Sequence, residues 1–270
     1  MLAIFLRTIK DRLVSTLVYI IGEISFIWMY VAIFPSMEDQ ADELSQAFAA
    51  YPESLMKAFG ITDMAAMFRK IENFLATENY SFLWPILAVA LVVSIGGYSI
   101  AGEIERKTIE TLLAQPISRI IIFISKYFSG LLIFVVFTAM TVFSIIPLAK
   151  IHGVDYFLEA HTKIFILGLL FGGAIYSITT LFSALFSERA KAYFFSVGVI
   201  VVMYALNIVS SLKDNLADLK YLSFFHYFNA NKALVDNQID PLAYYIFGGI
   251  MIGSTLLAAL IFSRRNITVS

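Results

Sequence analysis

Residues Gly102 to Lys126 read GEIERKTIETLLAQPISRIIIFISK, and they separate two long apolar runs, Phe82 to Ala101 and Tyr127 to Leu148. Charged side chains at this density cannot lie in hydrocarbon, so the stretch must form a loop at a membrane surface. Each flanking run has the ~20 residues needed to cross ~30 Å of hydrocarbon. The sequence therefore predicts a membrane-spanning helix on either side of a charged loop.

The charged loop itself predicts a short helix. Thr108 is a plausible N-cap, Glu110 falls in the first turn where the helix dipole favours an anion, and Pro116 stops the helix. The expected helix, Ile109 to Gln115, would group three apolar side chains, those of Ile109, Leu112 and Leu113. A half-apolar helix held just outside a membrane is suited to docking into a groove of another protein.

Composition narrows the class of protein. The chain has 270 residues, is 60% apolar and has a mean hydropathy of +0.82, whereas soluble domains are about 45–50% apolar. A net charge of −1 argues against a nucleic-acid partner, and the lack of cysteine excludes disulfides and cysteine-ligated metal sites. No GxxxxGK[ST] occurs, so we expect no P-loop ATP site in this chain.

Six apolar runs are long enough to cross a membrane, which predicts an all-α integral membrane protein with a single domain over residues 1–270. The expected spans are 13–34, 82–101, 127–148, 164–186, 192–212 and 242–262. The charged loop 102–126 connects the second and third spans, and two longer excursions cover 35–81 and 213–241.

Three connecting or flanking segments carry their own patterns. Met1–Arg12 has the apolar spacing and basic residues of a short amphipathic helix on the membrane surface, or simply of a frayed positive flank. Apolar residues between Leu44 and Leu75 predict short helices near the surface. The aromatic run Tyr221–Ala230 suits the membrane–water interface.

Charge bias predicts the orientation. The segments on the side of the two termini contain eleven Lys and Arg against five Asp and Glu, and the opposite side contains eight against fourteen. The positive-inside rule then puts both termini and the charged loop in the cytoplasm. We expect a multi-pass protein of the cell membrane, in contact with membrane lipid.

The charged loop resembles the signature loop of ABC-2 type permeases, the membrane subunits of one class of ABC exporters. The family pattern has a small residue and Glu, an acidic–basic cluster, Thr, Leu-Leu, Pro and Arg, then Lys. The matching positions are Gly102, Glu103, Glu105, Arg106, Thr108, Leu112, Leu113, Pro116, Arg119 and Lys126. Lys107 departs from the pattern, because the family usually has Gly before the Thr. The six-span layout extends the likeness over the whole chain.

The resemblance implies a six-span permease with a cytoplasmic coupling helix between spans 2 and 3, forming half of an export pathway. A separate ABC ATPase subunit would bind ATP and Mg²⁺, and a second permease copy, identical or related, would complete the pathway. The coupling helix would insert Leu112 and Leu113 into a cleft of the ATPase, with ion pairs from Glu105, Arg106 and Arg119. The implied coupling residues are Glu103, Glu105, Arg106, Thr108, Ile109, Leu112, Leu113, Pro116 and Arg119. Without the resemblance, a plain polar connector would explain the loop.

Polar residues inside the spans are the remaining candidates. Glu23 should face the bundle interior, protonated or partnered, and a structural hydrogen bond is favoured over a place in the transport path. Asn207 is expected to hydrogen-bond between helices. Three scattered histidines without cysteine do not predict a metal site, and no catalytic arrangement is found. Gly168, Gly172 and Gly173 predict close helix packing.

Two rival functions differ in kind from an exporter subunit. A membrane scaffold or sensor would dock a partner other than an ATPase on the charged loop. An intramembrane enzyme would use Glu23 or Asn207, but the spans hold no second ionisable group to assist. The sequence does not identify the exported substrate.

Overall fold

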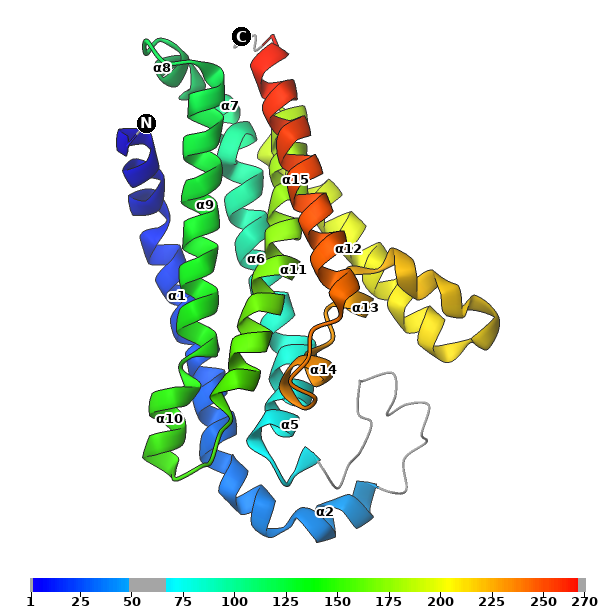
Figure 1. Ribbon diagram of the computed structural model, residues 1–270. Helices are drawn as coiled ribbons and strands as arrows, with labels where there is room; N and C mark the ends of the chain where they lie inside the picture. The colour runs from blue at the N-terminus through cyan, green and yellow to red at the C-terminus, as the bar shows by residue number, and fades with distance from the viewer. Residues whose placement is uncertain (1, 49–66, 267–270) are drawn as a thin grey trace.

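The computed structural model of the protein describes residues 2–48 and 67–266. Within these ranges the chain forms helices and no strand. Six helical stretches among the described residues are long and apolar enough to cross a membrane: Leu2–Asp39, Ile71–Glu105, Arg119–His152, Leu158–Leu185, Arg189–Leu212 and Pro241–Arg264. The all-α, six-span architecture predicted from the sequence is confirmed (Figure 1).

The first span is a single helix, α1 (Leu2–Asp39), followed by α2 (Ala41–Phe48). The separate surface helix expected for Met1–Arg12 is not formed, because residues 2–12 are the first turns of α1. The short helices expected between residues 44 and 75 are represented by α2 and α5 (Ile71–Leu75). Residues 49–66, on which part of that expectation falls, lie outside the described residues.

The second span is a composite helix that begins at Ile71 rather than at Phe82. After α5 come a π-helical segment η1 (Ala76–Leu83), the helix α6 (Trp84–Gly97), a second π-helical segment η2 (Tyr98–Gly102) and α7 (Glu103–Glu105). Residues 71–81 therefore belong to the helix and not to the excursion 35–81. Hydropathy does not predict that these residues belong to the span, because several of their side chains are polar. Three of these polar side chains, those of Glu72, Asn73 and Asn79, are nevertheless buried.

The helix α11 (Leu158–Leu185) lies at the centre of the bundle and packs against α6, α15 (Pro241–Arg264) and α9 (Arg119–Val142). Close packing depends on Gly172, since a Cβ there would meet the ring of Phe134, and on Gly168, which lies against Trp84. The loop between α7 and α9 contains α8 (Ile109–Leu113), and α10 (Ile145–His152) follows α9.

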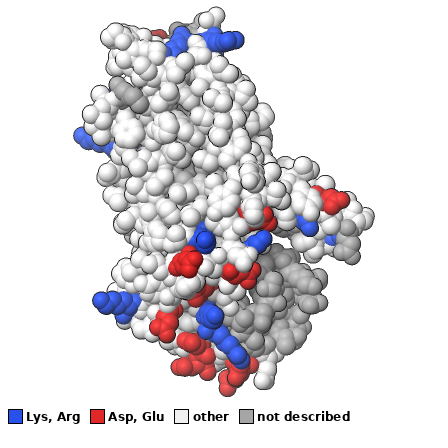
Figure 2. Space-filling view, viewed as in Figure 1, with Lys and Arg blue, Asp and Glu red and all other residues white. Residues whose placement is uncertain are grey.

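Figure 1 shows α8 and both ends of the chain at one end of the bundle, which we call the termini end. The opposite end carries α2, α5 and α10. In Figure 2 most of the surface between the two ends is uncharged, and Asp and Glu gather toward the end opposite the termini. The geometry agrees with the six-span count, since an even number of spans returns the chain to its starting side.

The excursion after the fifth span returns into the bundle. The helix α12 (Arg189–Leu212) leans away from the other spans and continues into the 3₁₀ segment η3 (Asp214–Leu222) (Figure 1). The next two helices, α13 (Phe224–Tyr227) and α14 (Ala230–Leu234), are buried. Phe228 between them stacks on Trp84, with ring centroids 5.8 Å apart, and on Phe171 at 4.5 Å. The aromatics expected at the membrane–water interface therefore form part of the core.

Candidate functional site

The loop between α7 and α9 is anchored by a buried ion pair. Lys126 Nζ lies 2.6 Å from Glu103 Oε1, and the two side chains are only 6% and 14% exposed. Thr108 donates its hydroxyl to the same Glu103 carboxylate and to the Glu103 carbonyl oxygen. Thr108 does occupy the N-cap position of α8, but its side chain makes no capping hydrogen bond. The expected cap is thus replaced by a contact that closes the loop on itself.

The apolar face of α8 is directed into this chain. Ile109 and Leu112 are 1% and 5% exposed and belong to the core, and Leu113 is half-buried against it. The resemblance implies that Leu112 enters a cleft of an ATPase, whereas in this chain the side chain is covered by its own fold. The helix is also shorter than the expected Ile109–Gln115. The outward surface is mostly polar. Its exposed residues include Glu105, Arg106, Glu110, Thr111, Ala114, Gln115 and Pro116.

Glu105 joins the loop to the start of α12. Its carboxylate lies 3.3 Å from the guanidinium of Arg189 and accepts a hydrogen bond of 2.9 Å from the Arg189 backbone N–H. The guanidinium carbon of Arg106 lies over the ring of Tyr98, 5.2 Å from the ring centroid. The guanidinium carbon of Arg12 on α1 lies 4.2 Å from the same centroid. These cation–π contacts connect the loop to α1 through span 2.

Arg119 and Arg265 connect the far end of the loop to the last span. The guanidinium of Arg119 donates to the carbonyl of Arg265 at 2.5 Å. Arg265 in turn donates to the carbonyls of Ala184 and Phe186 and to the Ser187 hydroxyl, at 2.7, 3.0 and 2.6 Å. Burial lowers the pKa of Arg265, but an arginine stays charged in proteins. The cation therefore satisfies carbonyls at the end of α11 that no helical N–H can reach.

Lys107 has the left-handed backbone conformation that glycine adopts most easily. Its φ is 60°, and its N–H donates to the Ile104 carbonyl at 3.0 Å. This is the position at which the ABC-2 pattern usually has Gly. The turn from α7 into α8 is thus formed with a lysine in place of the favoured residue.

The π-helical segment η2, which carries the loop, is held by Ser183 of α11. The Ser183 hydroxyl accepts hydrogen bonds from the backbone N–H groups of Ile100 and Ala101, at 3.1 and 2.9 Å. It also donates to the Gly97 carbonyl at 2.8 Å. A side chain inserted into the backbone hydrogen bonds of a helix is a recognised cause of such local distortion.

Glu23 and Asn207, the two polar candidates within the spans, differ in burial and in hydrogen bonding. Glu23 and Asn79 are both 0% exposed and form a hydrogen bond of 2.8 Å between Asn79 Nδ2 and Glu23 Oε1. Asn207 is only partly buried, and its side chain makes no hydrogen bond to another described residue. Glu23 thus has a partner on the second span, whereas Asn207 has no interhelical side-chain bond within the part of the chain that the structure describes.

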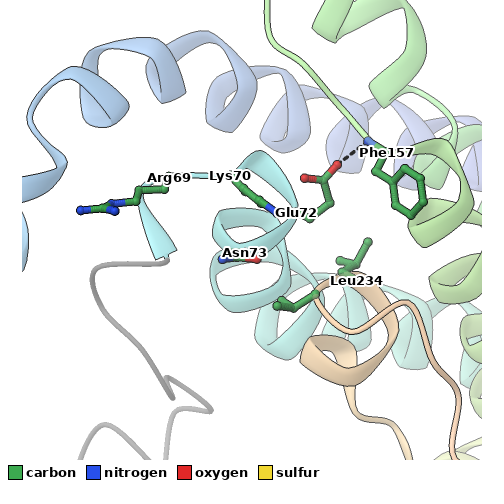
Figure 3. Close-up of a pocket in the computed structure, with 7 residues that line it drawn as sticks. Arg69, Lys70, Glu72, Asn73, Phe157 and Leu234 are labelled. Atoms are coloured by element: carbon green, nitrogen blue, oxygen red, sulfur yellow. Dashed lines mark hydrogen bonds between the residues drawn. The ribbon is translucent and has the colours of Figure 1, made fainter.

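Two cavities lie at opposite ends of the bundle. One of about 310 Å³ lies between α5 and α14 and is shown in Figure 3, where the Glu72 carboxylate accepts the Phe157 N–H at 2.5 Å. The other, of about 180 Å³, lies at the termini end and is lined in part by Arg7, Asp11, Glu103 and Lys126. Its wall joins the beginning of α1 to the anchored loop.

The sequence alone does not predict the contacts of four of these residues: Asn79, Ser183, Arg189 and Arg265. Asn79 falls in the excursion predicted for residues 35–81, and Ser183 is an ordinary residue of an apolar span. Arg189 and Arg265 lie beside the ends of apolar runs, where positive charges commonly flank a membrane span. Nothing local marks any of them, because each partner lies far away in sequence.

The comparisons with known proteins agree with this arrangement. No curated protein matches the sequence significantly. A family model described as "ABC-2 family transporter protein" matches residues 2–266, which is nearly the entire chain, and the protein therefore belongs to the ABC-2 transporter family.

Proposed function

We propose that this chain is the permease subunit of an ATP-driven exporter, forming half of the translocation pathway. A separate ATPase subunit, which holds ATP and Mg²⁺, would bind the outward polar surface of the loop, and a second permease copy would form the other half. The observation that carries the proposal is the anchoring of this loop to several spans. Ion pairs and hydrogen bonds fix it to α9, α12 and α15.

Such anchoring suits mechanical coupling. An isolated flexible loop could bind a partner without moving the membrane helices. Here a displacement of α8 would also displace α7, because Thr108 at the start of α8 is hydrogen-bonded to Glu103. It would displace α9 as well, because Glu103 forms a buried ion pair with Lys126, and breaking a buried ion pair is costly. Rigid-body movement of an ATPase on this surface would thus reach the spans directly.

The same proposal fixes the orientation. An ATPase that uses cytoplasmic ATP must meet the loop in the cytoplasm, so the termini end would face the cytoplasm of a cell membrane. The excess of Lys and Arg in the segments on that side supports this orientation.

The test uses exposed residues, because changing buried Leu112 would disturb the fold itself. The double variant Glu110→Lys and Thr111→Arg alters the outward face of α8, where both side chains are exposed. We expect it to abolish recovery of the co-purifying ATPase and its ATP turnover, while membrane insertion remains unchanged. The matched control is Lys150→Glu on α10, which is exposed at the opposite end of the bundle.

Unchanged ATPase recovery and turnover in the double variant would refute docking on α8. A tagged chain that recovers a stoichiometric partner without ATPase activity would instead favour a scaffold or sensor function. The second permease copy is tested separately, by co-purification of two differently tagged copies of this chain from one membrane.

A further inference from the structure

A carboxyl–amide pair joins two spans inside the apolar core. Glu23 lies on α1, about 16 Å beyond Arg12 along the helix axis at ~1.5 Å per residue. Asn79 lies on the π-helical segment η1 of the second span. Asn79 Nδ2 donates to Glu23 Oε1 at 2.8 Å, and both residues are fully buried.

Each of the two groups retains one buried oxygen without a partner. These are Glu23 Oε2 and Asn79 Oδ1. Both atoms are acceptors when Glu23 is ionised, so neither can satisfy the other. Buried polar atoms are normally hydrogen-bonded, and two orphaned acceptors on one bonded pair require an explanation. A single proton on Oε2 supplies the missing donor.

Among the described residues, no neighbouring cation offers an alternative. The lysine of α14, which packs against η1, is Lys232, and it pairs with Asp240 at 3.3 Å. The titratable groups with an electrostatic effect in this region are Tyr30 on α1 and Tyr80 and Glu78 on η1, none of which carries a positive charge. Two of the helices packed against α1 also supply no cation: α6 contains no ionisable residue, and the charged residues of α2 are both acids. The titratable groups on α5, α9 and α10 have partners other than Glu23 or are exposed. On α5, Glu72 accepts a hydrogen bond from the Phe157 N–H. On α9, Lys126 pairs with Glu103, Arg119 bonds Arg265 and Tyr127 bonds Ser177. On α10, His152 bonds Trp28 and Lys150 is exposed.

We infer that Glu23 is a membrane-buried proton-binding site. The Oε2 oxygen takes a proton from water, becomes a hydroxyl and donates it to Asn79 Oδ1, while Asn79 Nδ2 continues to donate to Oε1. The neutral acid and the amide then form a closed ring of two hydrogen bonds that satisfies every polar atom of the pair.

The site links proton binding to the contact between the first two spans. While the proton is bound, the pair fastens α1 to η1. Separation of these helices would admit water to Glu23 and release the proton. The location on a π-helical segment fits such a role, because these segments are frequent at functional sites. The inference does not depend on ATP coupling at the opposite end of the spans.

Infrared spectroscopy of the full chain in lipid nanodiscs tests the protonation state directly. At neutral pH the wild type should show the C=O stretching band of a buried, protonated carboxyl. Glu23→Gln should lose this band, whereas Glu78→Gln, which changes the nearby acid on the same π-helical segment, should keep it. Identical carboxyl bands in the wild type and in Glu23→Gln would overturn the inference.

A second variant tests the ring and covers the case in which Glu23→Gln does not fold. Asn79→Ala removes the acceptor of the proposed O–H donor, so the Glu23 band should move to higher frequency. No shift in this variant would overturn the acid–amide pair. Thermal unfolding gives a third readout. Above the ordinary pKa of a carboxyl the unfolded chain loses this proton while the fold keeps it, so the stability of the wild type should fall as pH rises from that range until Glu23 ionises in the fold. Glu23→Gln, which resembles the neutral acid in shape, should not show that loss.

Discussion

Lys107 holds a backbone conformation that is unfavourable for any residue with a Cβ. Its φ of 60° lies in the left-handed region, where a non-glycine residue costs roughly 1–2 kcal/mol. Lys107→Gly should remove this strain and stabilise the protein by up to about 1 kcal/mol, since the greater freedom of glycine in the unfolded chain offsets part of the gain. The measurement is thermal unfolding of the two purified proteins in the same detergent.

The control for Lys107→Gly is Lys191→Gly. Lys191 is also exposed but lies in the helix α12, where a glycine should cost about 1 kcal/mol relative to a good helix former. The two Lys→Gly changes are thus expected to have opposite signs. A loss of stability in Lys107→Gly similar to that in Lys191→Gly would show that the left-handed turn is not formed.

Ser183 contributes to stability through three hydrogen bonds made by one hydroxyl. Ser183→Ala would leave the N–H groups of Ile100 and Ala101 and the Gly97 carbonyl without this partner. Unsatisfied buried groups cost about 1–3 kcal/mol, so the melting temperature should fall clearly. Ser196→Ala is the matched control, because the buried Ser196 hydroxyl, among the described residues, bonds the Ala192 carbonyl of its own helix and no other group. Equal effects of the two changes would argue against a special role of Ser183.

Single residues also show where sequence reasoning reaches its limit. The cost of burying a carboxyl in a span required some partner or proton for Glu23, and that requirement could be stated from the sequence alone. The identity of the partner could not, because Asn79 lies in a segment whose polarity resembles that of a loop. The direction of Leu112 was equally undetermined, since an amphipathic helix has the same pattern whether its apolar face meets its own chain or another.

At the scale of elements, the contact between α11 and α9 depends on a residue without a side chain. A Cβ on Gly172 would lie 2.1 Å from Phe134 Cζ, and the Phe134 ring is fully buried. Gly172→Ala should therefore destabilise the protein by about 1–3 kcal/mol through overpacking. Gly249→Ala on α15 is the control, because a Cβ there meets nothing within 4 Å. Thermal unfolding should show a loss for Gly172→Ala and no loss for Gly249→Ala; two neutral results would refute the close contact.

The helix α15 begins with a capping carboxylate whose effect depends on pH. Asp240 accepts the Leu242 N–H at 2.9 Å and lies 3.3 Å from Lys232 Nζ. The Leu242 hydrogen bond, together with Lys232, lowers the pKa of Asp240. A lowered pKa in the folded state stabilises the protein above the pKa of the unfolded chain, and this contribution is lost as pH falls through the folded value.

Asp240→Ala should therefore cost about 1 kcal/mol at neutral pH. The difference from the wild type should shrink as the pH falls below the ordinary range of a carboxyl pKa and the wild-type carboxylate becomes protonated. Unfolding measured across this range, with Asp236→Ala as an exposed control on the same excursion, tests the prediction. A pH-independent difference would mean that the charged form of Asp240 makes no contribution.

The elements themselves were predictable to different degrees. Each span from α9 onward could be located because long apolar runs are a local property of the sequence. The π-helical segments η1 and η2 could not, since they depend on contacts with other spans, such as the bonds to Ser183. The burial of α13 and α14 likewise follows from the stacking of Phe228 on Trp84, two residues that are distant in sequence.

At the scale of the whole molecule, the anchored loop and the proton-binding site share the second span. Span 2 carries Glu103 at the termini end and Asn79 toward the other end, and both residues are bonded to a neighbouring span. A force applied at α8 would pass along this composite helix before it reached the Glu23–Asn79 contact. The two π-helical segments divide the helix between these points, and each is a place where its geometry can change.

The orientation of the bundle in the membrane, that is, which end faces the cytoplasm, is a property of the whole fold, and a single experiment can measure it. Because the chain contains no cysteine, a single introduced cysteine reports only its own position. Arg264→Cys places a thiol at the termini end, and Lys150→Cys places one on α10 at the opposite end; both native side chains are exposed. Since the positive-inside rule puts the termini end in the cytoplasm, a membrane-impermeant maleimide should label Lys150→Cys in intact cells. Arg264→Cys should react only after the membrane is permeabilised, which also verifies that its thiol is accessible. The reverse labelling pattern would place the polar surface of α8 outside the cell and would exclude a cytoplasmic ATPase as its partner.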